Sequence, residues 1–217
     1  MLMIYISPSV LACDFSKLGE EVAEIERGGA DMAHLDVMDG MFVTNMSFGF
    51  PIIESLRKVS NIVFDVHLMI AAPERYVERF AEAGADIITF HYEAASDSAA
   101  LLQKIRSLGK KAAISVKPAT PIDVVYPLLP LCDMVLVMTV EPGYGGQALI
   151  PECLDKVKAL RAEIERQGLS VDIQVDGGIN EKNAGAAIAA GANVLVAGSA
   201  VFRAEDKSAA IRALKEA

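Results

Sequence analysis

The chain has 217 residues, of which 53% are apolar and 23% charged, and its formal net charge at pH 7 is -9. This length and apolar content describe a folded protein with one core of ordinary domain size and exclude a disordered chain. The acidic surplus excludes a nucleic-acid-binding surface, which needs clustered Lys and Arg, so the expected partner is a small molecule.

Three cysteines, Cys13, Cys132 and Cys153, are far apart in the sequence and form no CxxC or Cys/His metal spacing. Isolated thiols in odd number suit a reducing compartment, and we expect a cytoplasmic protein. The apolar stretch before Pro8 is too short for a membrane span, and no Lys or Arg precedes Lys17. Neither a secretory signal nor a membrane partner is therefore expected.

In chain order, eight short runs rich in Val, Ile and Met predict buried strands bounded by turn residues. They cover residues 4–7, 32–37, 61–69, 86–92, 111–116, 133–140, 171–176 and 193–199. Segments with helical periodicity lie between them, among them residues 16–29, 73–85, 151–168 and 181–192. The motifs GGAD, AGAD and AGAN, which begin at Gly28, Ala83 and Ala190, each place a glycine where a predicted helix ends. This weak repeat marks successive returns from helix to strand.

The alternation predicts an α/β fold with a parallel sheet, because runs that are apolar on both faces need helices on both sides. A closed (β/α)8 TIM barrel that uses residues 1–217 as a single domain fits best. The structural alternative is an open, doubly wound sheet. Its phosphate-binding fingerprint GxGxxG is missing after the first strand, where the chain reads SPSVLACD.

Polar residues recur two apart in the predicted strands, which places both members of each pair on one face. The pairs are Ser7 and Ser9, His34 and Asp36, Asp65 and His67, Thr89 and His91, Ser115 and Lys117, and Gln174 and Asp176. We expect them late in their strands, because the carboxyl ends of barrel strands assemble active sites. A hydrogen-bonded core histidine is the better explanation for any single histidine. Three of them with flanking carboxylates indicate a site, since burying so much uncompensated polarity is costly.

Four of these residues, His34, Asp36, His67 and Asp176, combine two imidazoles with two carboxylates. Such a mixture suits Zn, Fe, Mn or Co better than Ca or Mg, which favour oxygen ligands. His91 is expected either to line the site or to support the ligand residues from behind. The prediction of one metal centre depends on the barrel, because no local spacing joins the four residues.

Glycines gather late in the chain, in PGYGGQ at residues 142–147, DGGIN at 176–180 and AGSAVF at 197–202. Ordinary turn glycines would explain any one of these loops. Three of them near the predicted last strands favour a phosphate site, because backbone N–H groups in the loops after strands seven and eight bind phosphate in many barrels. Such a site would let an acidic protein bind an anionic substrate without a basic patch.

Together these segments resemble the ribulose-phosphate 3-epimerase family over residues 7–202. The resemblance rests on SPSVLACDFSKLGEE, HLDVMDGMFVTNMSFG, DVHLMI, MTVEPGYGGQ, QVDGGIN and AGSAVF. It implies an enzyme that interconverts D-ribulose 5-phosphate and D-xylulose 5-phosphate by two-base proton transfer at C3, through a metal-stabilised enediolate. It further implies one divalent transition metal per subunit, a ketose phosphate substrate and a homo-oligomer.

The resemblance also implies roles for single residues. His34, Asp36, His67 and Asp176 would bind the metal, and Asp36 and Asp176 would also transfer the proton. The other implied positions are Ser9 and His67 as sugar contacts, Gly143, Tyr144, Gly145 and Gly146 as a flap, Gly177, Gly178, Gly198 and Ser199 as the phosphate site, and Met38, Met69 and Met138 as lining residues. Methionines that simply fill gaps in a core are nearly as good an explanation of the last three.

Two alternatives stay open, and the sequence disfavours a third. Thr44 replaces a usual proline and Leu149 a usual aromatic residue, so a 3-epimerase of a six-carbon ketose 6-phosphate remains a candidate. A non-catalytic phosphosugar-binding barrel should have lost at least one ligand position, and all four are present. A relative of orotidine-phosphate decarboxylase should carry DxKxxD where this chain reads DVHLMI.

Overall fold

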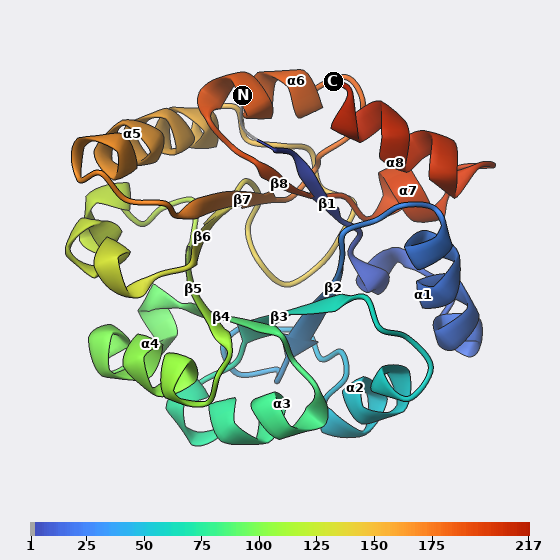
Figure 1. Cartoon of the computed structure of the whole chain (residues 1–217), viewed down its shortest axis with the longest axis horizontal. Helices are drawn as coiled ribbons and strands as arrows, with labels where there is room; N and C mark the ends of the chain where they lie inside the picture. The colour runs from blue at the N-terminus through green and yellow to red at the C-terminus, as the bar shows by residue number, and fades with distance from the viewer. Residues whose placement is uncertain (1–2) are drawn as a thin grey trace.

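Eight parallel strands surround a central axis in the computed structural model, which describes residues 3–217, and helices form a ring outside them (Figure 1). The strands are β1 (Tyr5–Ser7), β2 (Met32–Met38), β3 (Val63–Met69), β4 (Ile87–His91), β5 (Lys111–Val116), β6 (Met134–Met138), β7 (Asp172–Asp176) and β8 (Val194–Val196). The predicted (β/α)8 barrel is confirmed, and each of the eight predicted strands is present.

Strand order around the sheet is β1-β8-β7-β6-β5-β4-β3-β2, so the barrel closes where β1 meets β2. At this seam the amide of Asp31 donates to the carbonyl of Ile6, and the amide of His34 donates to the carbonyl of Pro8, both at 3.0 Å. Ser9 and His34 also form an isolated parallel bridge. These bonds join the two edge strands and leave the barrel without an open edge.

The surrounding helices are α1 (Leu18–Arg27), α2 (Phe50–Arg57), α3 (Val77–Ala83), α4 (Ser98–Ser107), α5 (Cys153–Arg166), α6 (Ala184–Ala190), α7 (Ser199–Phe202) and α8 (Lys207–Lys215). Between β5 and β6 the chain forms a 3-10 segment, Ile122–Leu131, instead of an α-helix. Pro127 and Pro130 lie inside it, and each lacks the N–H that an α-helix needs. No helix within residues 3–217 combines the length and apolar character needed to cross a membrane.

Alternate residues of each strand point to opposite sides of the barrel wall, and both sides are buried. Those that point outward, such as Leu35, Val66 and Ile114, are fully buried in the large core between the sheet and the helices. Those that point inward fill the barrel, where one end holds an apolar cluster of Met32, Ile87, Ala113, Met134 and Val194. Most of the other inward-pointing residues are polar, although Leu136 and Met138 of β6 also point inward, and the polar groups gather toward the other end of the barrel.

The polar residues reach deeper into the barrel than we expected. His34 and Asp65 are each the third of seven residues in β2 and β3, so they lie in the middle of their strands. The expectation that polar residues lie only late in the strands was wrong for these two. The physical reason is that Asp65 accepts hydrogen bonds from both Ser7 and Gln174 inside the barrel and so supports the residues above it.

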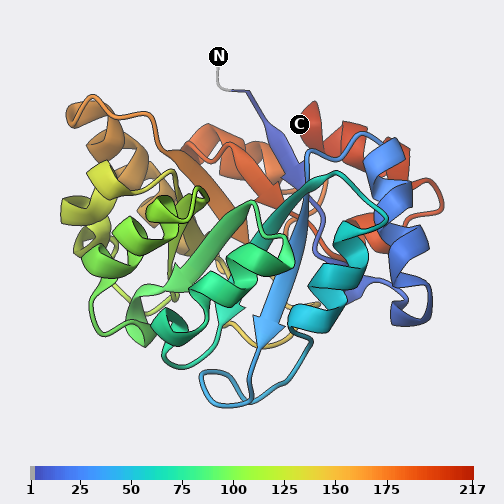
Figure 2. The same ribbon diagram turned by 60° about the horizontal axis from the view of Figure 1, so that its bottom comes forward.

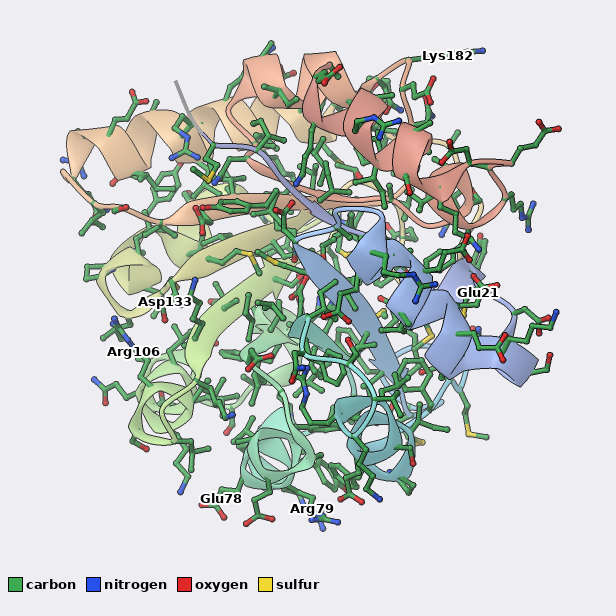
Figure 3. All side chains as sticks on the ribbon, turned by 45° about the vertical axis from the view of Figure 1, so that its right-hand side comes forward. Glu21, Glu78, Arg79, Arg106, Asp133 and Lys182 are labelled. Atoms are coloured by element: carbon green, nitrogen blue, oxygen red, sulfur yellow. The ribbon has the colours of Figure 1, made fainter. Side chains whose placement is uncertain are left out.

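Charged side chains lie on the outside of the helices (Figure 3). Arg79 of α3 pairs with Glu54 at 2.6 Å, and Arg106 of α4 lies 3.5 Å from Asp133. Exposed pairs of this kind stabilise a fold only weakly. The stability of the barrel therefore depends mainly on its buried apolar clusters.

Candidate active site

Four side chains predicted as metal ligands converge at one end of the barrel. One donor atom from each of His34, Asp36, His67 and Asp176 lies within 4.8 Å of the other three. Asp36 Oδ1 is 3.3 Å from His34 Nε2 and 3.2 Å from His67 Nδ1. Asp176 Oδ2 is 3.6 Å and 3.7 Å from the same two nitrogens. The structure thus brings all four residues together, although they come from β2, β3 and β7.

The four ligand residues, which we call the ligand cluster, differ in exposure. The two histidine side chains are fully buried, that of Asp36 is 5% exposed and that of Asp176 is 16% exposed. The histidines therefore lie beneath the carboxylates. His67, which we also expected to contact the sugar, does not line the cavity.

The ligand cluster favours positive charge. Burial by itself would lower the pKa of His34, but the charges of Asp65 and Asp36 outweigh burial and raise that pKa well above its usual value. Burial would likewise raise the pKa of Asp36, and the neighbouring His34 instead holds it far below its usual range. Two carboxylates and two ring nitrogens around one point are a donor set for a divalent cation such as Zn, Fe, Mn or Co.

Asp65 supports His34 from inside the barrel. Its Oδ2 lies 2.7 Å from His34 Nδ1 and accepts hydrogen bonds from Ser7 Oγ and Gln174 Nε2. A carboxylate beside Nδ1 keeps a proton on that nitrogen and directs Nε2 toward the ligand cluster. Sequence analysis placed Asp65 on the correct face of its strand but assigned it no role.

His91 lies beside His67 and away from the cavity. Its Nε2 is 2.9 Å from His67 Nε2, and its Nδ1 is 3.3 Å from Glu93 Oε2, without good hydrogen-bond alignment. Burial lowers the pKa of His91 to about 4, so its ring is neutral at pH 7. The third histidine is thus part of the site's support.

A cavity of about 960 Å³ opens above the ligand cluster. Asp36 and Asp176 form part of its wall, and the hydroxyl of Ser9 donates to Asp36 Oδ2 at 2.6 Å. The other predicted residues in the wall are Met38, Met69, Met138, Gly143, Tyr144, Gly145, Gly146, Gly177, Gly178, Gly198 and Ser199. Every predicted site residue except the two buried histidines therefore faces this cavity.

The loop with the predicted flap closes one side of the cavity. Its base is held where Asn45 Nδ2 donates to the carbonyl of Gly143 at 2.9 Å, and Tyr144 at its tip is 63% exposed. Asn45 belongs to the long loop after β2, which projects from the end of the barrel opposite the start of β1 (Figure 2). A Cβ added to Gly178 would lie 2.3 Å from the amide nitrogen of Leu149, so only glycine lets the two loops pack this closely.

Sequence reasoning assigned no role to five polar residues of the cavity wall, Glu141, Gln147, Asn180, Asn183 and Arg203. Among the described residues that line the cavity, Arg203 is the one with a cationic side chain. It directly follows the AGSAVF motif, which was the available signal. An arginine just after a short helix has the appearance of an ordinary surface residue, and only the fold directs it toward the glycine loops.

Comparison with known proteins gives the same assignment along the whole chain. Residues 5–202 match the model of the ribulose-phosphate 3 epimerase family. The ribulose-phosphate 3-epimerase of Synechocystis sp. is 48% identical over 98% of this chain and 93% of its own length, and that of Bacillus subtilis is 44% identical over 98% and 99%. A solved mutant tryptophan synthase alpha-subunit from Pyrococcus furiosus is 14% identical, covers 100% of this chain and 98% of that one, and has a TM-score of 0.70. That last likeness concerns the barrel fold alone.

Proposed function

Because this chain belongs to the ribulose-phosphate 3-epimerase family, we propose that it interconverts D-ribulose 5-phosphate and D-xylulose 5-phosphate by moving the proton at C3. One observation carries the mechanism: the carboxylates of Asp36 and Asp176 face the same cavity from β2 and β7. These strands are separated in the barrel by β1 and β8. Two carboxylates that approach from different sides match a reaction on two faces of one carbon.

Inversion at C3 requires that a proton leave from one face and that a proton return to the other. A single fixed base serves one face only, so Asp36 and Asp176 act as the pair, one accepting while the other donates. The hydrogen bond from Ser9 orients the Asp36 carboxylate. The side chains of Asp36 and Asp176 are only 5% and 16% exposed, which limits exchange of the transferred proton with water.

The ligand cluster fits a divalent transition metal by its chemistry and by its support. His34 Nε2, His67 Nδ1 and one oxygen each of Asp36 and Asp176 would hold the ion. A bound cation supplies Lewis acidity, which stabilises negative charge on the sugar oxygens beside C3. The contact of Asp65 with His34 supports this assignment, because it directs a ring nitrogen into the ligand cluster before any ligand binds.

The glycine loops after β7 and β8 suit the phosphate group of the substrate. Gly177, Gly178, Gly198 and Ser199 lie along one wall of the cavity, and Arg203 adds a positive charge there. Backbone N–H groups at this place in a barrel bind phosphate by hydrogen bonding. The flap from Gly143 to Gly146 would then cover the sugar and exclude water.

The test is to incubate the metal-loaded protein with ribulose 5-phosphate in deuterated water and to follow the sugar by NMR. We expect xylulose 5-phosphate with deuterium at C3, because the carboxylate that returns a proton to C3 carries a deuteron taken up from the solvent before the sugar binds. Absence of both product and exchange would reject the pentose assignment. A six-carbon ketose 6-phosphate is assayed in parallel, and turnover of that sugar alone would identify the six-carbon sugar as the substrate.

A further inference from the structure

The two ring nitrogens of His67 have different neighbours. Nδ1 lies 3.2 Å from Asp36 Oδ1 and 3.3 Å from His34 Nε2, so it faces the ligand cluster. Nε2 points the other way and lies 2.9 Å from Nε2 of His91. Only Nδ1 is therefore placed to bind a cation at the ligand cluster.

This arrangement determines where the protons of both rings must be. A nitrogen that binds a cation uses its lone pair and carries no proton, so cation binding at His67 Nδ1 leaves the proton on Nε2. Two nitrogens 2.9 Å apart share one proton, and His91 Nε2 must then accept it. The proton of His91 itself has to be on Nδ1, which faces Glu93 Oε2 at 3.3 Å.

The surroundings of His91 hold its ring in this orientation. The side chain is fully buried, and the ring centroid of Phe42 lies 4.8 Å from that of His91. Glu93 is held in turn, because its Oε1 accepts hydrogen bonds from the amide of Lys117 at 2.8 Å and from the hydroxyl of Thr120. Rotation of either side chain would break these contacts.

We propose that His91, whose Nδ1 lies beside the Glu93 carboxylate, is a positioning residue that keeps His67 in the tautomer whose Nδ1 binds the cation. The inference rests on the cation site proposed above and extends it to two residues that touch neither the cation nor the sugar. An imidazole nitrogen at this distance is a suitable acceptor. It directs His67 without adding another negative charge beside Asp36 and Asp176.

The first experiment measures the binding of Co²⁺ to the purified chain, by competition with a chelator and by the visible spectrum of the bound ion. We expect His91→Leu, which offers no acceptor, to bind Co²⁺ about 10- to 100-fold more weakly and with an altered spectrum. His91→Gln, whose amide oxygen can accept from His67, should recover most of the affinity. Thr89→Val is the matched control, because Thr89 lies on the inner face of the same strand and its hydroxyl has no hydrogen-bond partner among residues 3–217.

The outcomes distinguish this inference from the proposed cation site on which it rests. Absence of divalent-cation binding by the wild-type chain would contradict both proposals. Wild-type affinity and an unchanged spectrum in His91→Leu would overturn the role of His91 and leave the cation site standing.

A second measurement does not depend on the folding of a variant. The nitrogen-15 NMR spectrum of the zinc-loaded wild-type chain, labelled at histidine, reports which ring nitrogen carries each proton. We expect His91 in the Nδ1–H form and His67 with its proton on Nε2. A proton on Nε2 of His91 would overturn the inference.

Discussion

At the scale of single residues, the two proposed proton-transfer groups are held differently. Asp36 accepts a hydrogen bond from Ser9 at 2.6 Å and is almost completely buried. Asp176 is the more exposed of the two, and its main chain is held where the amide of Thr139 donates to its carbonyl at 2.8 Å. Both side chains depend on rigid strands, so a substitution that keeps their shape tests chemistry more than folding.

We expect Asp36→Asn and Asp176→Asn each to lower kcat by about 100- to 10,000-fold, because an amide of the same shape cannot accept the C3 proton. Circular dichroism should show an unchanged fold. Asp172→Asn is the control, since Asp172 begins the same strand as Asp176 and does not line the cavity. Turnover near the wild-type rate in either active-site variant would contradict the two-carboxylate mechanism.

The thiols provide a test of the pKa shifts. Burial, and then the charge of Asp133, raises the pKa of Cys132 to about 12, and burial followed by Glu21 raises that of Cys13 to about 11. Ionisation is thus disfavoured in the folded state, so the neutral thiols contribute stability below about pH 8.5 that is lost as pH rises through the folded-state pKa values.

We therefore expect iodoacetamide at pH 8 to alkylate Cys13 and Cys132 of the native protein at least about 100-fold more slowly than free cysteine, since thiolate is the reactive form. In guanidinium chloride all three cysteines should react at the ordinary rate. Mass spectrometry counts the modified sites. A native Cys13 or Cys132 that reacts like free cysteine would show that its pKa is not raised.

At the scale of elements, two helix ends use the same local arrangement. Gly84 ends α3 and Gly191 ends α6, with φ of 115° and 113°. A Cβ on these glycines would lie 2.8 Å and 2.7 Å from the side chains of Arg57 and Arg161. Arg161 also donates to the carbonyl of Gly191. These positions need glycine for both conformation and space.

Gly191→Ala should lower the free energy of unfolding by about 1–3 kcal/mol, because alanine is strained at this φ and its methyl group would displace Arg161. Gly185→Ala, within α6, is the control, since no left-handed φ occurs there and the nearest contact is at 3.6 Å. That variant should be more stable by about 0.4–1 kcal/mol. Urea denaturation measures both, and equal stability of the two variants would contradict the argument.

At the scale of the whole molecule, the barrel brings two carboxylates and two imidazoles to one point. Asp36 and Asp176 approach the same point from strands that are far apart in the sequence, and folding alone creates their proximity. A cation that binds this arrangement, and not the unfolded chain, stabilises the fold by mass action. Stability and catalysis should therefore depend on the same ion.

Removal of bound metal with a chelator should abolish turnover and lower Tm. At a metal concentration of about 100 times Kd the stabilisation is about 2.7 kcal/mol, which corresponds to about 5–10 °C for a chain of this size. Re-addition of Zn²⁺, Mn²⁺ or Co²⁺ should restore both. The Asp176→Asn variant should show a smaller shift, and an identical Tm with and without metal would argue against a cation at the ligand cluster.

Much of the fold and of the site could be predicted from the sequence, because the signals for them lie in neighbouring residues. Short apolar runs predicted all eight strands, and the motif around Gly191 predicted a helix end that the structure confirms. Boundaries were less accurate: the run at 193–199 contains the strand Val194–Val196, and α7 already begins at Ser199. Residues that bind a ligand through backbone N–H groups leave a weaker signal in the sequence. The same holds for residues such as Asp65, which act only through a neighbouring side chain.

The sequence by itself determined the barrel and the residue types of the ligand cluster, because hydrophobic period and motif composition are properties of neighbouring residues. Only the tertiary structure decided which nitrogen of each histidine faces the ligand cluster, and that His91 supports His67 while Asp65 supports His34. Those contacts depend on the register between strands, and Asp65 meets Gln174 across 109 positions of sequence. Strand tilt and barrel closure set these distances, and no local pattern encodes them.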